Sequence, residues 1–234
     1  DALQTGVKML PVSIAMFLAS AAGSRLSSRY PVRTIVRAGL IFSVLAIFVL
    51  LATIQPTLKE SSFAWAMGLL GIGMGLIASQ LGNVVQSSVD ASGRGEAGGL
   101  QYTGQQLGSS LGVALIGAIA LTGLTSAFVS NVTNDQRISA EISTQVGVAA
   151  GNGVDFVSID EVEAAAAKAG LDQPTTEAII DDYQQAELKA LKTGLLAAGL
   201  LVLLSLSSTR NLPHDKPGSS AADGAQVGAP ISTG

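Results

Sequence analysis

Amide and hydroxyl side chains recur within two long stretches of the sequence that contain no charged residue. Several of them follow one another at intervals of four residues, as Gln101, Gln105 and Ser109 do. The full set is Gln80, Asn83, Gln86, Gln101, Gln105 and Ser109. An amide both donates and accepts hydrogen bonds, but it does not ionise. The chemistry available here is therefore recognition by hydrogen bonding.

Glycines accompany these side chains at the same four-residue interval. Gly71 and Gly75 lie in the first stretch, and Gly104, Gly108 and Gly112 lie in the second. Residues four apart share one face of a helix, and glycines on that face let another helix approach closely. We expect these glycines to form helix-packing faces. The neighbouring amides have two interpretations: they line one wall of a polar cavity, or they join neighbouring helices by hydrogen bonds.

The elements that hold these residues have the length and composition of membrane spans. Residues 38–58, 61–89 and 97–134 contain no Asp, Glu, Lys, Arg or His. A bilayer core about 30 Å thick needs about 20 apolar residues of helix, and all three stretches provide them. Two shorter stretches, 9–24 and 193–209, become long enough when the charged residues at their ends reach into the headgroups.

The sequence therefore predicts an all-α membrane protein with five transmembrane helices and a small helical extracytoplasmic insert. The predicted spans are 8–25, 35–55, 63–88, 98–128 and 190–209. In domain terms, four helices occupy 1–129, an acidic insert 130–188, the last helix 189–209 and a disordered cytoplasmic tail 210–234. Because the chain starts at Asp1, close to a span and without a signal peptide, we expect it to be the C-terminal part of a larger polytopic protein.

The overall composition agrees with a lipid environment. The 234 residues are 48% hydrophobic and 13% charged, with a mean hydropathy of +0.47. Soluble proteins carry about 25% charged residues. The net charge of −4 argues against nucleic acid as a partner, because binding phosphates requires a basic surface. The chain has no cysteine, and its one histidine, His214, lies in the polar tail.

Four arginines set the predicted orientation. Arg25, Arg29, Arg33 and Arg37 lie between the first two spans with no acid among them. Positive residues concentrate in cytoplasmic loops, so we expect this loop to be cytoplasmic. By alternation, the insert lies outside the cell and the tail inside, in a multi-pass protein of the plasma (cell inner) membrane.

The insert is strongly acidic and predicted to be helical. Residues 135–187 contain eleven acids against two basic residues. Ser158 and Glu161 have the spacing of a capping box before an alanine-rich helix that ends at Gly170. A second helix is expected to begin near Thr175 and continue into the last span. The acids either attract cationic molecules or form a solvated face.

Three segments resemble one transporter family. The segment Gly95–Ala114, with its repeated glycines and glutamines, is similar to the penultimate-span signature of fourteen-span drug:proton antiporters of the major facilitator superfamily. The start at Gly6–Pro11 resembles the tenth span of that group, and the end at Ala186–Pro213 resembles its last span. The resemblance covers nearly the whole chain in order.

The resemblance implies that the chain forms spans ten to fourteen, most of the C-terminal bundle, with the first, third and fourth spans lining a central cavity. It also implies partners: the lipid bilayer, a small-molecule substrate, protons and the remaining N-terminal spans of the same transporter. Transport would proceed by alternating access, as two bundles rock around a midplane site. Two features depart from the family: Ser28 replaces an acid and Pro31 a glycine in the first inner loop. Many relatives also carry arginine where Gln105 stands.

We therefore expect a multidrug efflux permease working by proton antiport. A sugar or organic-anion carrier of the same fold and a non-transporting membrane scaffold are the alternatives. An enzyme is not expected, since no nucleophile–base pair or metal-ligand cluster occurs, and no cofactor is predicted. Gly71, Gly73 and Gly75 mimic a nucleotide-binding loop, but they lie inside an uncharged span rather than after a strand. No span contains an acid, so a titrating carboxylate has to come from elsewhere in the protein.

Overall fold

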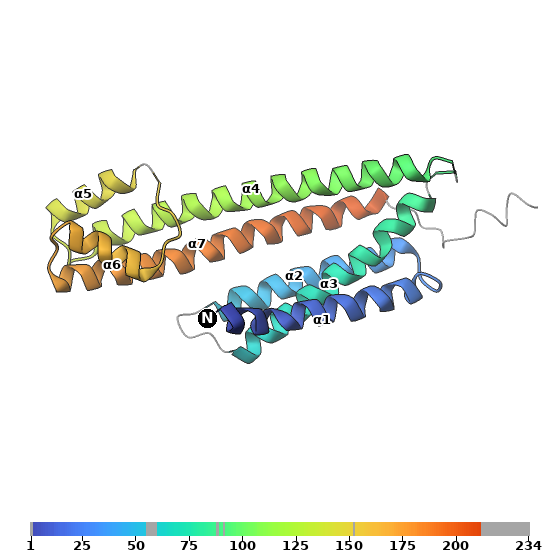
Figure 1. The fold of residues 1–234 in the computed structure, drawn as a ribbon, viewed down its shortest axis with the longest axis horizontal. Coiled ribbons are helices and arrows are strands. Elements are labelled where there is room, and N and C mark those ends of the chain that lie inside the picture. Colours follow the sequence, from blue (N-terminus) through green and yellow to red (C-terminus); the bar gives the residue numbers. More distant parts are fainter. Residues whose placement is uncertain (1, 55–59, 88, 91, 152, 212–234) are drawn as a thin grey trace, which may run out of the picture. The chain divides into compact units, whose positions relative to one another are not determined.

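The computed structural model describes residues 2–54, 60–87, 89–90, 92–151 and 153–211, and helices make up most of this part of the chain (Figure 1). The elements are α1 (Ala2–Leu26), α2 (Val32–Thr53), α3 (Glu60–Ser87), α4 (Arg94–Asn134), α5 (Ala140–Ala150), α6 (Ile159–Lys168), α7 (Gln173–Ser208) and the 3-10 turn η1 (Thr209–Asn211). No strand occurs among the described residues.

Five helices are long and apolar enough to cross a membrane. The segments are Gly6–Leu26, Val32–Thr53, Ser61–Gly82, Arg94–Asn134 and Gln173–Ser208. Each overlaps one predicted span, which confirms the prediction of an all-α membrane protein with five spans. The predicted disordered tail, including His214, lies outside the described residues except for Arg210 and Asn211.

Two features of the helices differ from the sequence prediction. Helix α4 continues to Asn134, beyond the expected end at residue 128, because its buried face continues through Phe128 to Val132. Helix α5 was not predicted at all. It begins after Ser139, whose side chain accepts a hydrogen bond from the backbone N–H of Ile142, as an N-cap residue does.

The described chain divides into two compact units, and α4 and α7 contribute to both. The first unit contains α1, α2, α3, α4 as far as Leu107 and α7 from Gly199 onwards. The second contains α4 from Gly108, then α5, α6 and α7 as far as Ala198.

In the first unit, α3 packs against both α1 and α2 (Figure 1). Its contact with α1 is made by small residues. A Cβ atom on Gly75 would touch the carbonyl oxygen of Met16 and lie 2.9 Å from the Cβ of Ala19. One turn earlier, a Cβ on Gly71 would touch the carbonyl oxygen of Val12. Residue numbers rise together along the two helices, so α1 and α3 are parallel.

The contact between α2 and α3 is equally close and uses a different face of α3. A Cβ atom on Gly73 would touch the hydroxyl of Ser43 and lie 2.7 Å from the carbonyl oxygen of Gly39. A Cβ on Gly39 would lie 2.8 Å from the Cγ1 of Ile77. Position 39 is near position 77 and position 43 near position 73, which makes α2 and α3 antiparallel.

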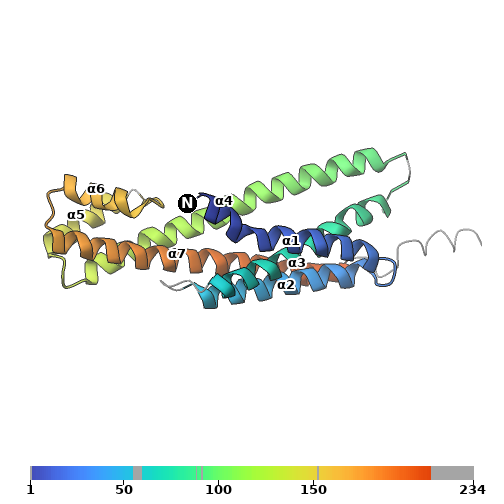
Figure 2. The same cartoon turned by 60° about the horizontal axis from the view of Figure 1, so that its bottom comes forward.

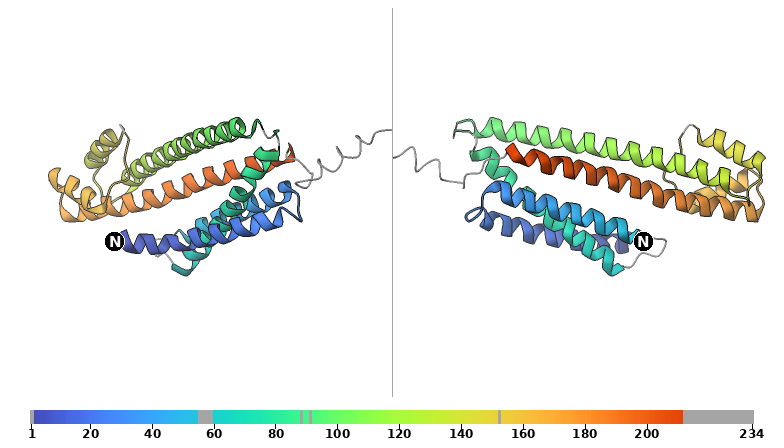
Figure 3. Two further views of the ribbon diagram at one scale, coloured as in Figure 1. Left: turned by 45° about the vertical axis from the view of Figure 1, so that its right-hand side comes forward. Right: turned by 180° about the vertical axis from the view of Figure 1, so that it is seen from behind.

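In the second unit, α4 and α7 run side by side (Figure 3). A Cβ atom on Gly194 would lie 3.4 Å from the Cβ of Ala120. Further along, the Nδ2 of Asn131 donates a hydrogen bond of 3.1 Å to the carbonyl oxygen of Asp182. From the first contact to the second, the residue number rises along α4 and decreases along α7, so the two helices are antiparallel.

Helices α5 and α6 pack at the end of the α4–α7 pair and give the insert a hydrophobic core (Figure 2). Leu124 and Val132 of α4 and Ile179 and Tyr183 of α7 are buried in this core, together with Ile138 from the connection to α5. The ring of Tyr183 meets that of Phe128 edge to face, with centroids 5.8 Å apart.

The two ends of α6 follow the sequence prediction. Ser158 and Glu161 form the capping box, each side chain accepting a hydrogen bond from the other residue's backbone N–H. At the other end, Gly170 has a φ of 72°, and the N–H of Leu171 reaches back to the carbonyl oxygen of Ala166. This is a Schellman ending, in which glycine adopts the left-handed conformation without strain.

Candidate functional site

The amide and glycine stripe of α4 is open in the described structure. A Cβ atom on Gly104, Gly108 or Gly112 would meet nothing within 4 Å. The side chains of Gln105 and Ser109 are exposed, and Gln101, one turn before Gln105, is half-buried. With a rise of about 1.5 Å per residue, the stripe extends roughly 16 Å along the helix. It offers hydrogen-bonding groups beside a flat surface made by glycines.

The glycines of α3 have the same spacing and the opposite environment. Gly71 and Gly75 are buried against α1, as described above. Spacing alone did not distinguish these glycines from Gly104, Gly108 and Gly112. Of these two sets, the described part of the chain places a neighbouring helix against the α3 glycines and no group within 4 Å of the α4 glycines.

Gln80 of α3 belongs to the packed surface. It is fully buried, and its Nε2 donates hydrogen bonds of 3.0 Å to the carbonyl oxygen of Gly23 and 2.9 Å to the hydroxyl of Ser79. The Oε1 of Gln80 has no hydrogen-bond partner. Gln80 therefore joins α3 to α1, and no described contact brings it to the α4 amides. The backbones of Asn83 and Gln86 lie in α3, but their side chains lie outside the described part of the structure.

The four arginines occupy a shorter loop than the sequence suggested. Arg25 lies in the last turn of α1 and Arg29 in the connecting turn, whereas Arg33 and Arg37 already belong to α2. Helix α2 begins directly after Pro31, whose carbonyl oxygen accepts hydrogen bonds from the backbone N–H groups of Thr34 and Ile35. The Nε of Arg37 donates a hydrogen bond of 2.8 Å to the hydroxyl of Thr209, which fastens η1 to the start of α2.

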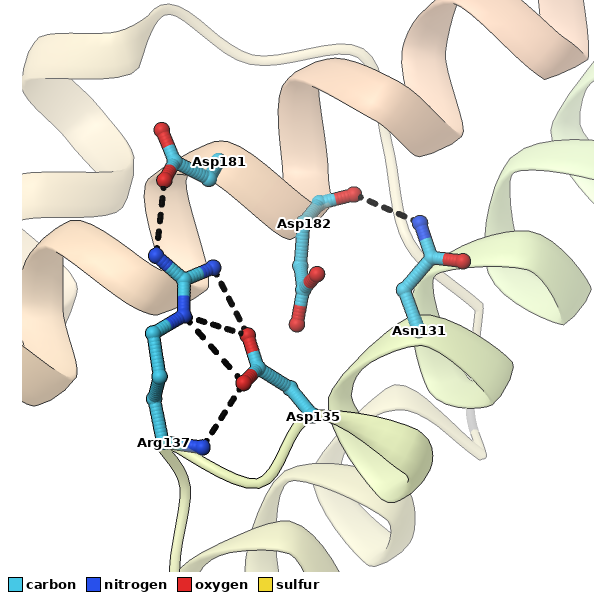
Figure 4. Close-up of polar contacts among 5 residues, drawn as sticks. All are labelled: Asn131, Asp135, Arg137, Asp181 and Asp182. Atoms are coloured by element: carbon cyan, nitrogen blue, oxygen red, sulfur yellow. Dashed lines mark hydrogen bonds and ion pairs between the residues drawn. The ribbon is translucent and has the colours of Figure 1, made fainter.

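The insert contains a polar cluster that the sequence analysis missed (Figure 4). Arg137 forms ion pairs with Asp135, at 2.7 Å, and with Asp181 of α7, at 2.9 Å. The hydrogen bond from the Arg137 side chain lowers the pKa of Asp135, and the same bond raises the pKa of Arg137. The only local signal was an arginine two residues after an aspartate.

Asp182 lies beside this cluster and is almost completely buried, with 5% of its surface exposed. Its Oδ2 has no hydrogen-bond partner, and its backbone carbonyl accepts the bond from Asn131 (Figure 4). A buried carboxylate with an unpaired oxygen costs stability. In the described residues, no group of three or more histidine or acidic side chains is placed to hold a metal ion.

The first four helices match a known family. The sequence profile of the Major Facilitator Superfamily matches residues 2–133, from the start of α1 almost to the end of α4. The insert and α7 lie beyond this match. No curated protein and no solved structure gave a match in the corresponding searches. Members of the superfamily are membrane transporters. Since the match covers more than half of the 234 residues, the chain belongs to the Major Facilitator Superfamily.

Proposed function

We propose that the chain forms part of a secondary active transporter of the plasma membrane that exports drugs or other amphipathic small molecules by proton antiport. The observation that carries the proposal is the open stripe on α4, where Gln105 and Ser109 are exposed beside three glycines with free space around them. The similarity of the same segment to the penultimate span of drug:proton antiporters supports it.

The chemistry of the stripe suits an amphipathic molecule. Polar side chains at membrane depth usually face protein or water rather than lipid. An amide there can donate to or accept from the polar group of a substrate, whatever the orientation of that group. The glycines let a flat apolar surface approach the backbone closely. One helix face thus provides contacts for both halves of such a molecule.

The chain supports only part of an antiport mechanism. The candidate spans in α1, α2 and α3 contain no Asp or Glu. Those in α4 and α7 contain acids only near their beginnings, outside the spans 98–128 and 190–209 that the sequence predicts. A proton-coupled carrier needs a titratable group within the membrane. We therefore assign the proton-carrying acid to other spans of the same transporter, which would alternate with this bundle in exposing the site to the two sides.

The substitution Gln105→Leu in the complete transporter tests the site. Losing one hydrogen bond to the substrate costs about 0.5–1.5 kcal/mol, so drug export should fall roughly two- to tenfold at an unchanged amount of protein in the membrane. Gln106→Leu is the matched control, because it makes the same change on the next residue, about 100° around the helix. Asn83→Leu should behave like Gln105→Leu. Equal losses of export for Gln105→Leu and Gln106→Leu would refute the proposed site.

The coupling needs a separate measurement. Collapse of the proton gradient by an uncoupler should stop export from cells, or from vesicles loaded with a fluorescent drug. Export that continues at the same rate without the gradient would rule out antiport, although it would leave the α4 site standing.

A further inference from the structure

The insert contains a pocket that none of the preceding functions uses. Its volume is about 500 Å³, and it lies between α5, α6, the end of α4 and the start of α7. Pockets that bind small molecules have volumes of about 300–1,000 Å³ and mostly apolar walls. The walls here are mainly apolar, and they include Phe128, Val146, Val154, Val162, Ile179 and Tyr183.

Hydrogen bonds hold one wall of this pocket in place. The connection between α5 and α6 passes along the pocket, and the N–H of Val154 donates to the hydroxyl of Thr125 at 3.0 Å. The N–H of Val157 donates to the hydroxyl of Tyr183 at 2.8 Å, and that hydroxyl lies 3.0 Å from the carbonyl oxygen of Asp155, to which it can donate. Two helices thus fasten this connection, so the pocket is formed before any ligand arrives. Preformed sites bind at a smaller entropic cost.

The charged residues of the pocket are of one sign. Asp155 and Glu161 line it, both exposed to solvent, and the described lining includes no Lys, Arg or His. Glu161 keeps one carboxylate oxygen on the backbone of Ser158 through the capping box. The surrounding insert adds to this field, with eleven acids against two basic residues between 135 and 187. An anion would be repelled here, whereas a cation would be attracted.

The apolar walls and the acidic rim together indicate the class of ligand. Phe128 and Tyr183 are among the lining residues and both are buried, so they add apolar surface for the body of a ligand. We propose that this pocket binds an amphipathic organic cation, with its apolar body against α6 and α7 and its charge near Asp155 and Glu161. The inference goes beyond the proposed function, because binding in the insert requires no transport.

Tetraphenylphosphonium is a suitable probe, and tetraphenylborate has nearly the same shape with the opposite charge. Equilibrium dialysis of the full chain in detergent should show saturable binding of the cation and at least tenfold weaker binding of the anion. The double variant Asp155→Asn/Glu161→Gln should bind the cation at least fivefold more weakly. The variant should keep helix α6 intact, because glutamine still completes a capping box. Equal affinity for the two ions would overturn the proposal and would indicate an occupant without charge, such as a lipid acyl chain.

A bulky substitution locates the binding. Ala165 lines the pocket and is exposed, so Ala165→Trp should block the pocket without disturbing the core. Ala164→Trp is the matched control, because Ala164 is exposed on the same helix and does not line the pocket. At saturation, Ala164→Trp should bind one more cation per chain than Ala165→Trp. Cations held elsewhere, including at the α4 stripe, cancel in this difference, so the result is independent of the proposed transport site. Equal binding by both variants would overturn the proposal.

Discussion

The Nε2 of Gln80 donates a hydrogen bond of 3.0 Å to the carbonyl oxygen of Gly23, which joins α3 to α1. The bond forms because Gly23 has no side chain: a Cβ atom there would touch the hydroxyl of Ser79, next to Gln80. The same carbonyl also accepts the N–H of Ser27, which closes the end of α1. One oxygen thus serves the end of one helix and the packing of another.

The substitution Gln80→Leu should change stability only slightly. It removes the two hydrogen bonds of the Nε2, to Gly23 and to Ser79, each worth about 0.6 kcal/mol in membranes. It also removes the unpaired Oε1, which offsets part of this loss, while Gly23 keeps the bond from Ser27 and the Ser79 hydroxyl keeps its bond to Leu76. We expect the free energy of unfolding to decrease by less than about 1 kcal/mol in Gln80→Leu. In Gln80→Ala, which leaves a cavity, it should decrease by about 2 kcal/mol or more. Unfolding by SDS titration in mixed micelles measures both. A larger loss for leucine than for alanine would mean that the amide itself determines stability.

Alanine substitutions should separate the two sets of glycines. In Gly75→Ala the new methyl group meets the backbone of α1 at Met16 and the Cβ of Ala19, which should cost about 1–3 kcal/mol. In Gly108→Ala it meets open space, and the better helix propensity of alanine adds up to about 1 kcal/mol of stability. The SDS midpoint of this chain on its own should fall for the first variant and stay or rise for the second. Similar shifts in both would contradict the packing described for α3.

Local features of the sequence predicted local structure well. Ser158, Glu161 and Gly170 define the two ends of α6 because caps depend on residues within one turn. The environment of a glycine depends instead on residues far away in the chain. Gly75 and Gly108 therefore look alike in sequence, although one contacts α1 and the other meets open space.

Long-range contacts explain what the sequence analysis did not predict. Arg137 meets Asp181 across 44 residues, and nothing in either local sequence indicates the pairing. Helix α5 is short and joins a core built by α4 and α7, so its stability comes from those contacts rather than from its own composition. The spans were predictable because the length of an apolar stretch is a local property that the bilayer sets.

The ion pair at Asp135 should make the stability of the insert depend on pH. Arg137 lowers the pKa of Asp135 in the folded state, so the unfolded chain takes up a proton there first as the pH falls. The stabilisation is complete above the ordinary aspartate pKa, about 3.9, and is lost as the pH drops through the lower folded value. We expect Asp135→Asn to be less stable than wild type at pH 7 and to differ progressively less below about pH 4.

This difference in stability between wild type and Asp135→Asn is measured by hydrogen exchange of the α5 and α6 amides at several pH values between 7 and 3. Glu163→Asn, on an exposed residue of α6, is the control for the loss of an acid. A difference between Asp135→Asn and wild type that stays constant over the whole range would show that the ion pair does not cause it.

The orientation rests on the arginines between α1 and α2, and single cysteines test it directly because the chain has none of its own. Ala164 is exposed in the insert, and Ser28 is exposed in the turn beside Arg25 and Arg29. Because positive residues stay on the cytoplasmic side, an impermeant maleimide added to intact cells should label Ala164→Cys and spare Ser28→Cys. Permeabilised cells should show labelling of both, which confirms that each thiol is reactive. Labelling of Ser28→Cys alone in intact cells would invert the topology and place the acidic insert, with its pocket, in the cytoplasm.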